Sequence, residues 1–286
     1  MTVSATGPDL PCRIIFSALD AATAREVEPR CAQAGQFVFS NASAHRMDED
    51  VPLLIPEVNA DALELLDCQR RRRGWRGALV ANANCSTMFL AMALHPLHRA
   101  FGVRRAFVST MQAVSGAGYP GVASLDILGN VIPDISGEAE KMESETRKIL
   151  GDLENGAVRP AAMALSAMTH RVPVEDGHLE AVSAGFERPA SAEEVERAWE
   201  DFRGPDVVRA LPSAPRRPLV YVREPHRPQP RRDVDTEDGM AAVIGGLEPC
   251  AVLDWKFRVL GHNTVRGAAG ASLLNAEYAV ARGLLD

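Results

Sequence analysis

Several familiar signals are missing from this chain of 286 residues. Its five cysteines are widely spaced and odd in number, and no Cys-x-x-Cys pair occurs, so neither a disulfide framework nor a zinc site is indicated. There is no run of 18 apolar residues and no charged-then-apolar leader, which indicates neither a membrane span nor a secretory signal. The net charge of −7 argues against a nucleic-acid or membrane-surface partner. We therefore expect a soluble, cytoplasmic protein in a reducing compartment.

Metal chemistry is also poorly supported. His95 and His98 share one helix face, but no carboxylate or third ligand accompanies them. Two histidines at this spacing are weak grounds for a metal site, since a bound metal needs further ligands. The sequence therefore predicts no metal ligands.

What the chain does contain is a large apolar fraction, 46% of its residues, which is enough for one large domain or two smaller ones. In the first part, apolar strands at 13–19 and 36–40 alternate with a helix at 21–35, which is typical of parallel βα units. Ligands of such units bind beyond the carboxyl ends of the strands.

In the second part, strand follows strand. The segments that we expect to be strands are 164–169, 179–186, 219–222, 240–244 and 252–260. The prediction is an α/β fold, with a Rossmann-like parallel sheet plus an α+β domain whose sheet is mixed and largely antiparallel.

The most informative stretch is Asn82-Ala83-Asn84-Cys85-Ser86-Thr87. It lies between an apolar strand at 77–80 and an apolar segment at 88–94, so it predicts a strand, a tight turn and a helix, with Ser86 or Thr87 as available caps. A thiol at a helix N-terminus faces unpaired N–H groups and the positive end of the helix dipole, which favour the thiolate. The alternative, a small buried cysteine at the start of a helix, stays open on these residues alone.

Other polar groups lie in loops or on one helix face. The loop at 40–46 carries Asn41 and Arg46 at an expected binding edge, or is an ordinary polar turn. Three glycines follow Gln112 within a few residues and allow a close approach of backbone to a ligand, although the stretch is not Gly-x-Gly-x-x-Gly.

Glu138, Lys141 and Glu145 form one face of a helix at 136–150, a face we expect to meet solvent. His178 follows Asp176-Gly177 in a turn, where it is either a general acid or base or a surface residue. A thiol, a glutamine, a Glu/Lys face and a turn histidine together suit acyl transfer through a thioester.

Taken in order, these motifs resemble the aspartate-β-semialdehyde dehydrogenase family, particularly its archaeal and fungal-type branch. The matching segments run almost from end to end of the chain. They are residues 38–46, 55–59, 84–87, 112–118, 137–141, 171–174, 177–178, 261–264 and 266–270.

The resemblance implies roles for individual residues. Cys85 would be the nucleophile, Gln112 would orient the substrate, and His178 would be the acid/base that relays protons. Arg171 would pair with the substrate α-carboxylate, and Glu138 would meet its α-amino group.

The remaining implied contacts are with phosphate and cofactor. Arg46, Lys141 and Asn84 would line the phosphate site. Ser115 and Gly116 would lie against the nicotinamide, and Asn263 is also expected to contact the cofactor. In the family, the thiolate attacks aspartyl-4-phosphate, phosphate leaves, and NADPH reduces the thioester to the aldehyde; a homodimer or homotetramer is typical.

There are two departures from the family pattern. Ala83 stands where the family usually has proline, which should loosen the turn before Cys85. The glycine-rich turn that cradles the cofactor pyrophosphate is not found either. We therefore expect 1–84 with 265–286 to form a partial dinucleotide-binding domain that lacks its first βαβ unit, and 85–264 to form the catalytic and dimerisation domain.

Three functions are compatible with this pattern. The first is an NADP-dependent dehydrogenase of amino-acid biosynthesis. The second is an acyltransferase or hydrolase that uses the same Cys85 thioester without a cofactor. The third is a non-catalytic, truncated subunit that pairs with a full-length partner. The intact set of reacting residues favours an enzyme.

Overall fold

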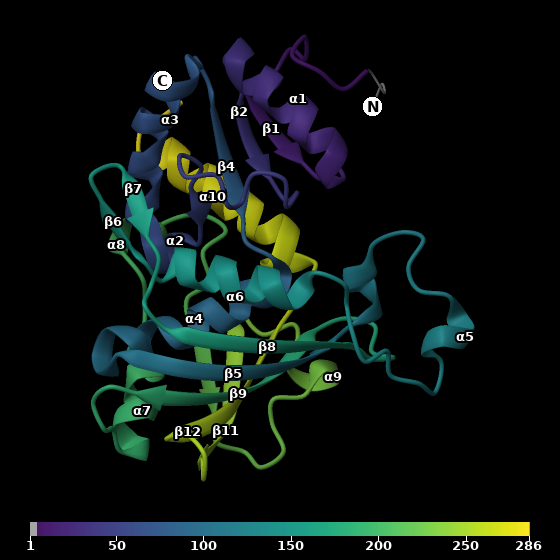
Figure 1. Cartoon of the computed structure of the whole chain (residues 1–286), viewed down its shortest axis with the longest axis vertical. Helices are drawn as coiled ribbons and strands as arrows, with labels where there is room; N and C mark the ends of the chain where they lie inside the picture. The colour runs from purple at the N-terminus through teal and green to yellow at the C-terminus, as the bar shows by residue number, and fades with distance from the viewer. Residues whose placement is uncertain (1–4, 286) are drawn as a thin grey trace.

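The computed structural model describes residues 5–285. Two sheets lie one beyond the other along the long axis of the molecule, and helices fill the space between them (Figure 1). The C-terminal helix α10 (Gly270–Ala281) packs against the sheet formed by the first strands.

The first sheet is parallel throughout, as predicted. Its strand order is β1-β2-β4-β3. The strands are β1 (Ile14–Ser17), β2 (Phe37–Ser40), β3 (Leu53–Leu54) and β4 (Ala78–Asn82). Helix α1 (Ala21–Ala34) is capped at its N-terminus by Asp20, whose side chain accepts from two backbone N–H groups. Its C-cap is Gly35, in the left-handed conformation. The segments that connect β3 to β4 are α2 (Pro56–Asn59), η1 (Ala60–Glu64) and α3 (Leu65–Arg73).

The second sheet has the order β10-β11-β12-β9-β5-β8. Its two outer pairs are parallel and the three inner pairs are antiparallel, so the prediction of a mixed, largely antiparallel sheet is confirmed. The strands are β5 (Val103–Gln112), β8 (Ala164–Arg171), β9 (His178–Phe186), β10 (Leu219–Val222), β11 (Ala242–Pro249) and β12 (Trp255–Gly261).

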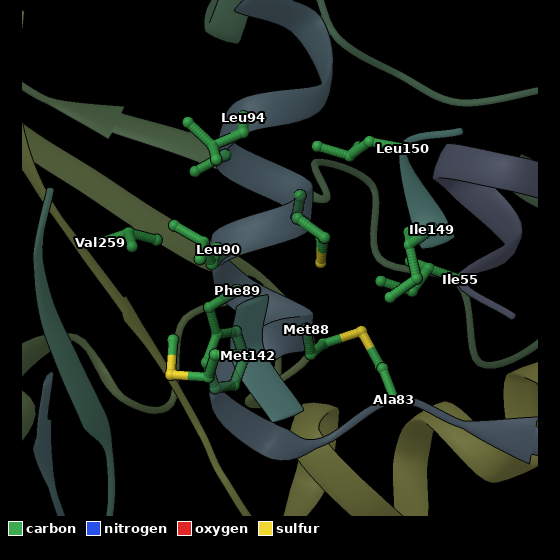
Figure 2. Packing of buried hydrophobic residues seen from close by; sticks show 14 of the residues in the cluster. Ile55, Ala83, Met88, Phe89, Leu90, Leu94, Met142, Ile149, Leu150 and Val259 are labelled. Carbon is green, nitrogen blue, oxygen red and sulfur yellow. The ribbon is translucent and has the colours of Figure 1, made fainter. Parts of the chain in front are cut away.

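Helix α4 (Cys85–Phe101) lies between the two sheets and belongs to the core of both. Phe89, Leu90 and Leu94 face β12, and Met88 faces the opposite way, toward Ala83 (Figure 2). The fit is tight, because a Cβ added at Gly261 would lie 1.9 Å from the ring of Phe89. Helices α6 (Glu138–Ile149) and α7 (Ala192–Glu200) pack on the same side of the second sheet as α4, and the predicted capping box of Ser191 and Glu194 is present at the start of α7.

Short elements fill the connections. They are η2 (Val114–Ala117), α5 (Ser124–Ile127), α8 (Asp206–Arg209), α9 (Pro230–Asp233) and η3 (Val265–Ala269). A hairpin of β6 (Asp152–Glu154) and β7 (Ala157–Arg159) was not expected, although its turn, Asn155-Gly156, has the positive φ angles for which that dipeptide is the usual sequence signal. Within residues 5–285, no helix is both long and apolar enough to cross a membrane.

A buried ion pair ties the C-terminal segment to the first part of the chain. Arg266 in η3 donates two hydrogen bonds, of 2.8 and 2.7 Å, to the carboxylate of Glu57 in α2. The side chain of Arg266 is fully buried and that of Glu57 is 2% exposed. The packing of α10 and η3 near the first sheet fits the expected grouping of 265–286 with 1–84, which remains a prediction as a domain boundary.

We predict that Arg266→Met lowers the free energy of unfolding by about 3–5 kcal/mol, because it leaves the Glu57 carboxylate buried without its partner. Urea unfolding followed by circular dichroism measures the change. Arg209→Met is the control, since Arg209 pairs with Asp206 at the surface, and its effect should stay below about 1 kcal/mol. Equal effects of the two substitutions would contradict a special role for the buried pair.

Candidate active site

Cys85 begins helix α4, directly after β4 and a short turn, as predicted. The cap, however, is Asn84 and not Ser86 or Thr87: its side-chain oxygen accepts from the N–H groups of both residues, at 3.0 and 3.1 Å. The backbone of Gly267, in η3, packs directly against Cys85: a Cβ added at Gly267 would lie 2.8 Å from the Cβ of Cys85.

The protonation state of Cys85 differs from the expectation. Burial and the nearby carboxylate of Glu138 raise the pKa of the thiol to about 12, although the positive charges of Arg46 and Arg171 act in the opposite direction. The N–H of Ser86 at the helix N-terminus does lower this pKa, in the direction that we predicted, but the net shift is upward. Desolvation and one like charge outweigh the helix dipole and both arginines.

His178 is fully buried at the start of β9, so it is not a surface turn residue. The N–H of Ala113 donates to its Nδ1 at 3.1 Å, which places the ring proton of the neutral imidazole on Nε2. Burial and the charge of Arg171 lower the pKa of His178 to about 3, so the ring is neutral at physiological pH. Its Nε2 is buried and has no hydrogen-bond partner within the described residues. The site thus contains a free N–H donor.

The guanidinium group of Arg171 lies near His178, and its charge also acts on the thiol of Cys85. A Cβ added at Gly116 would lie 2.8 Å from Nη1 of Arg171 and 2.9 Å from Nε2 of His178, so the glycine backbone lies directly against both side chains. Arg171 donates to the carbonyl of Ala113 at 2.8 Å. Its charge influences the pKa of both Cys85 and His178. The thiol and the imidazole therefore lie around one guanidinium group.

Gln112 and Asn263 complete this side of the site. Gln112 ends β5, opposite Arg171 in the sheet register, and donates to the hydroxyl of Thr110 at 3.3 Å. Asn263 accepts from the N–H of Gly177 and donates to the hydroxyl of Ser115, both at 2.8 Å. It thus links the glycine loop to the turn before His178.

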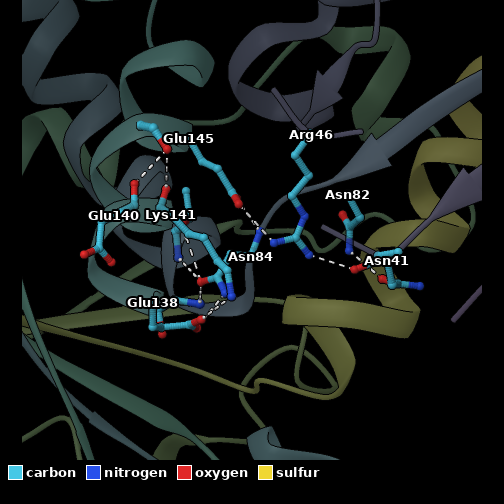
Figure 3. A network of polar contacts seen from close by, with 12 residues as sticks. Asn41, Arg46, Asn82, Asn84, Glu138, Glu140, Lys141 and Glu145 are labelled. Atoms are coloured by element: carbon cyan, nitrogen blue, oxygen red, sulfur yellow. Dashed lines mark hydrogen bonds and ion pairs between the residues drawn. The ribbon is translucent and has the colours of Figure 1, made fainter. Parts of the chain in front are cut away.

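Two glutamates of the polar face of α6, Glu138 and Glu145, are buried against the turn that precedes Cys85 (Figure 3). Glu138 accepts from the side chain of Asn84 at 2.6 Å and from Lys141 at 3.3 Å. Glu145 accepts from the backbone N–H of Asn84 at 2.8 Å. The prediction that this face meets solvent is wrong for Glu138 and Glu145, because segments distant in the sequence cover them. The side chain of Lys141 is 39% exposed.

Arg46 reaches the same place from the loop after β2. It donates to Glu145 at 3.0 Å and to the carbonyl of Asn41 at 2.7 Å. Its Nε is buried and lacks a partner within residues 5–285, so one donor of the guanidinium group is unused. The structure thus brings the expected phosphate-site residues Arg46, Lys141 and Asn84 into one network (Figure 3).

Lys148 and Glu180 are buried charged residues near the site for which the sequence analysis predicted no role. Lys148 continues the polar face of α6 beyond Glu145, so helical periodicity contains a signal for it. Glu180 lies two residues after His178, on the same face of β9, and is fully buried. Across the described residues, no three His, Cys, Asp or Glu side chains gather as metal ligands would.

Comparison with known proteins places this geometry in a family. A model described as the dimerisation domain of semialdehyde dehydrogenases matches residues 94–266, and one described as their NAD-binding domain matches residues 4–66. Aspartate-semialdehyde dehydrogenase of Methanothermobacter thermautotrophicus is 52% identical over 92% of this chain and 76% of its own length. The chain belongs to the aspartate-semialdehyde dehydrogenase family. The family resemblance seen in the sequence is thereby confirmed.

The solved structure of aspartate-semialdehyde dehydrogenase with NADP from Candida albicans superimposes with a TM-score of 0.91 and 36% identity, covering 99% of this chain and 83% of that one. The predicted fold class is thereby confirmed. A malonyl-CoA reductase (NADP) of Metallosphaera sedula is 38% identical over 96% of this chain and 78% of its own length. The relatives of this chain therefore include proteins named as aspartate-semialdehyde dehydrogenases and one named as a malonyl-CoA reductase.

We predict that Glu138→Gln speeds alkylation of Cys85 by iodoacetamide at pH 8 about tenfold, because one pKa unit changes the thiolate fraction tenfold. The sign follows from the charge: the Glu138 carboxylate raises the pKa of Cys85, so its removal lowers that pKa and more thiolate forms. Mass spectrometry of the Cys85 peptide over time measures the rate. Glu140→Gln, which removes an exposed carboxylate of the same helix, is the control. Slower alkylation in Glu138→Gln would contradict the assigned effect.

Proposed function

We propose that this chain reduces L-aspartyl-4-phosphate to aspartate semialdehyde through a thioester on Cys85, with NADPH as the reductant, in cytoplasmic amino-acid biosynthesis. One observation carries the proposal. Glu138 accepts from the side chain of Asn84, the residue before Cys85, and Glu145 holds Arg46 beside the backbone N–H of the same residue, so a carboxylate and a cation lie next to Cys85. The charge of Arg171 also acts on the thiol. An acyl phosphate with an α-carboxylate and an α-ammonium group has the complementary charges.

Each charged group then has a partner on the substrate. Arg171 forms a bidentate pair with the α-carboxylate, and Glu138 meets the α-ammonium group. Arg46, Lys141 and the N-cap Asn84 surround the phosphate. Gln112, at the end of β5, orients the acyl group. Once the ammonium group neutralises Glu138, that carboxylate no longer raises the pKa of Cys85, so substrate binding itself favours the thiolate.

In the acylation step, the sulfur of Cys85 bonds to the acyl carbon and the bond between that carbon and the phosphate oxygen breaks. The thiol proton leaves with the phosphate, which balances the step. His178 donates a hydrogen bond from Nε2 to the acyl oxygen as negative charge develops there. In the unliganded structure its Nδ1 is occupied by the N–H of Ala113. We therefore assign it the role of a donor first, and proton relay through it requires that this contact opens.

NADPH supplies the hydride that converts the thioester to the aldehyde. The residues of the glycine loop fit its nicotinamide end, because Gly116 has no room for a side chain and Ser115 is oriented by Asn263. No strand and no glycine-rich turn occur in the described residues before β1. Within residues 5–285, the residues that we assign to the cofactor would therefore contact its nicotinamide end.

The other functions compatible with the sequence make different demands on the same residues. A cofactor-independent acyltransferase or hydrolase needs the Cys85 thioester but no hydride donor. A non-catalytic subunit needs neither. A malonyl-CoA substrate has no α-ammonium group, so it would bring no cation to the buried carboxylate of Glu138, whose partners in the structure are Asn84 and the half-exposed Lys141. The Glu138 position therefore favours an amino-acid substrate.

We expect that aspartate semialdehyde, phosphate and NADP⁺ give NADPH in a spectrophotometric assay, and that Cys85→Ser lowers kcat by about 10³-fold or more, because the covalent route is lost. Cys250→Ser, which alters a cysteine in the loop beyond β11, is the control and should retain the activity. An acyl adduct on Cys85 with aspartyl phosphate but no NADPH turnover would support the acyltransferase or hydrolase. Neither adduct nor turnover would support the non-catalytic subunit.

The open face of the second sheet is the proposed contact with a second copy of the chain. Helices α4, α6 and α7 cover the other face, so alternate side chains of β5, β8 and β9 point outward. Phe107 and Met168 on this face are 41% and 52% exposed. The face lies within the residues matched by the dimerisation-domain model, which favours a second copy of this chain as its occupant. The result would be a homodimer, or a homotetramer built from two dimers.

We predict that Met168→Glu converts the oligomer into monomers, because it places a charge beside Phe107 on the face that we propose is buried against the second copy. Light scattering coupled to size-exclusion chromatography measures the mass. Val252→Glu is the control: Val252 is 88% exposed but lies in the turn between β11 and β12, so its variant should keep the oligomer. A monomeric parent protein, or an unchanged mass in Met168→Glu, would contradict this surface.

A further inference from the structure

Two buried charges on α6 have no part in the chemistry described so far. Glu145 is 2% exposed and Lys148 is 6% exposed. They follow Glu138 and Lys141 on the same face of the helix, one turn after another. Burying a charged group is costly unless it is paired and hydrogen-bonded, so the contacts of these two side chains show what they hold in place.

Glu145 joins two parts of the site with one carboxylate. One oxygen accepts from Nη1 of Arg46 at 3.0 Å, and the other accepts from the backbone N–H of Asn84 at 2.8 Å. Asn84 caps α4 and immediately precedes Cys85. The carboxylate therefore sets the spacing between the guanidinium group of Arg46 and the start of the nucleophile's helix (Figure 3).

Lys148 holds the backbone that carries Arg46. Its ammonium group donates to the carbonyls of Arg46, Asp48 and Val51, at 2.7, 2.8 and 3.0 Å. All three protons of the ammonium group are thus used on a single loop that follows β2. Arg73 and Gln69 also bind this loop, at Asp48 and Asp50, but within the described residues only Lys148 joins the carbonyl of Arg46 to the carbonyls further along the loop.

We propose that Glu145 and Lys148 are positioning residues that hold Arg46 at a set distance from Cys85, so that the phosphate of the substrate is bound while its acyl carbon faces the sulfur. Neither side chain touches the substrate. The inference rests on the proposed function in one respect, the assignment of Arg46 to the phosphate. Lys148 acts through the loop, and Glu145 acts through the guanidinium group and the Asn84 N–H.

The two residues make different chemical demands. Both partners of Glu145 are donors, so Glu145→Gln presents an amide NH₂ to one of them and loses either Arg46 or Asn84. Lys148→Gln loses the charge, one of the three donor hydrogens used at the carbonyls and part of the length of the side chain. Lys148→Arg keeps the charge and several donors, and should restore part of the function.

The test is the reverse reaction with inorganic phosphate as the varied substrate, at saturating aspartate semialdehyde and NADP⁺. We expect Lys148→Gln and Glu145→Gln to raise the KM for phosphate about tenfold or more, with kcat at saturating phosphate within about threefold of the parent, and Lys148→Arg to give an intermediate KM. Arg147→Gln is the matched control: it removes the same charge from the exposed neighbour of Lys148 and should leave both constants unchanged.

Further outcomes separate the failure of this inference from the failure of the proposed function. An unchanged KM for phosphate in Arg46→Gln would overturn the assignment of Arg46. A raised KM in Arg46→Gln with a parental KM in Lys148→Gln and Glu145→Gln would overturn the positioning role alone. A loss of kcat with an unchanged KM in both variants would also overturn it. If Lys148→Gln fails to fold, as thermal unfolding would show, Glu145→Gln and Lys148→Arg decide the question by the same constants.

Discussion

The structure depends on pairing the charges that are buried around the N-terminus of α4. Asn84 is held there by two glutamates of α6, through its side chain and its backbone N–H. One of these glutamates also holds Arg46, which comes from the first sheet. Because unpaired charges in such a place are costly, the first sheet, α4 and α6 are constrained to a single arrangement.

This constraint explains the resting state of the nucleophile. The carboxylate of Glu138, together with burial, raises the pKa of Cys85 to about 12. The neutral His178, whose pKa burial and Arg171 lower to about 3, presents an N–H donor and not a ready base. Both groups are therefore in their neutral forms at physiological pH.

Sequence reasoning succeeded where the information is local. The alternation of strands and helices predicted the parallel sheet, and the residues around Cys85 predicted a strand, a turn and a helix. It failed for the polar face of α6, since periodicity identifies a face but not the segments that cover it. It also missed Lys148, whose three partners lie about a hundred residues earlier in the chain.

The sequence by itself determined the family, the order of the elements and the residue types available for chemistry, because these depend on short-range pattern and on motifs that can be read directly. Only the tertiary structure decided that burial and Glu138 raise the pKa of Cys85 more than the helix N-terminus lowers it. It also decided that His178 is buried with its proton on Nε2, and that Glu138 and Glu145 of α6 contact Asn84. The physical reason is that desolvation and Coulombic interactions depend on neighbours in space. In this protein those neighbours are Arg46 in the loop after β2, Arg171 at the end of β8 and Glu138 in α6, all far from Cys85 in the chain.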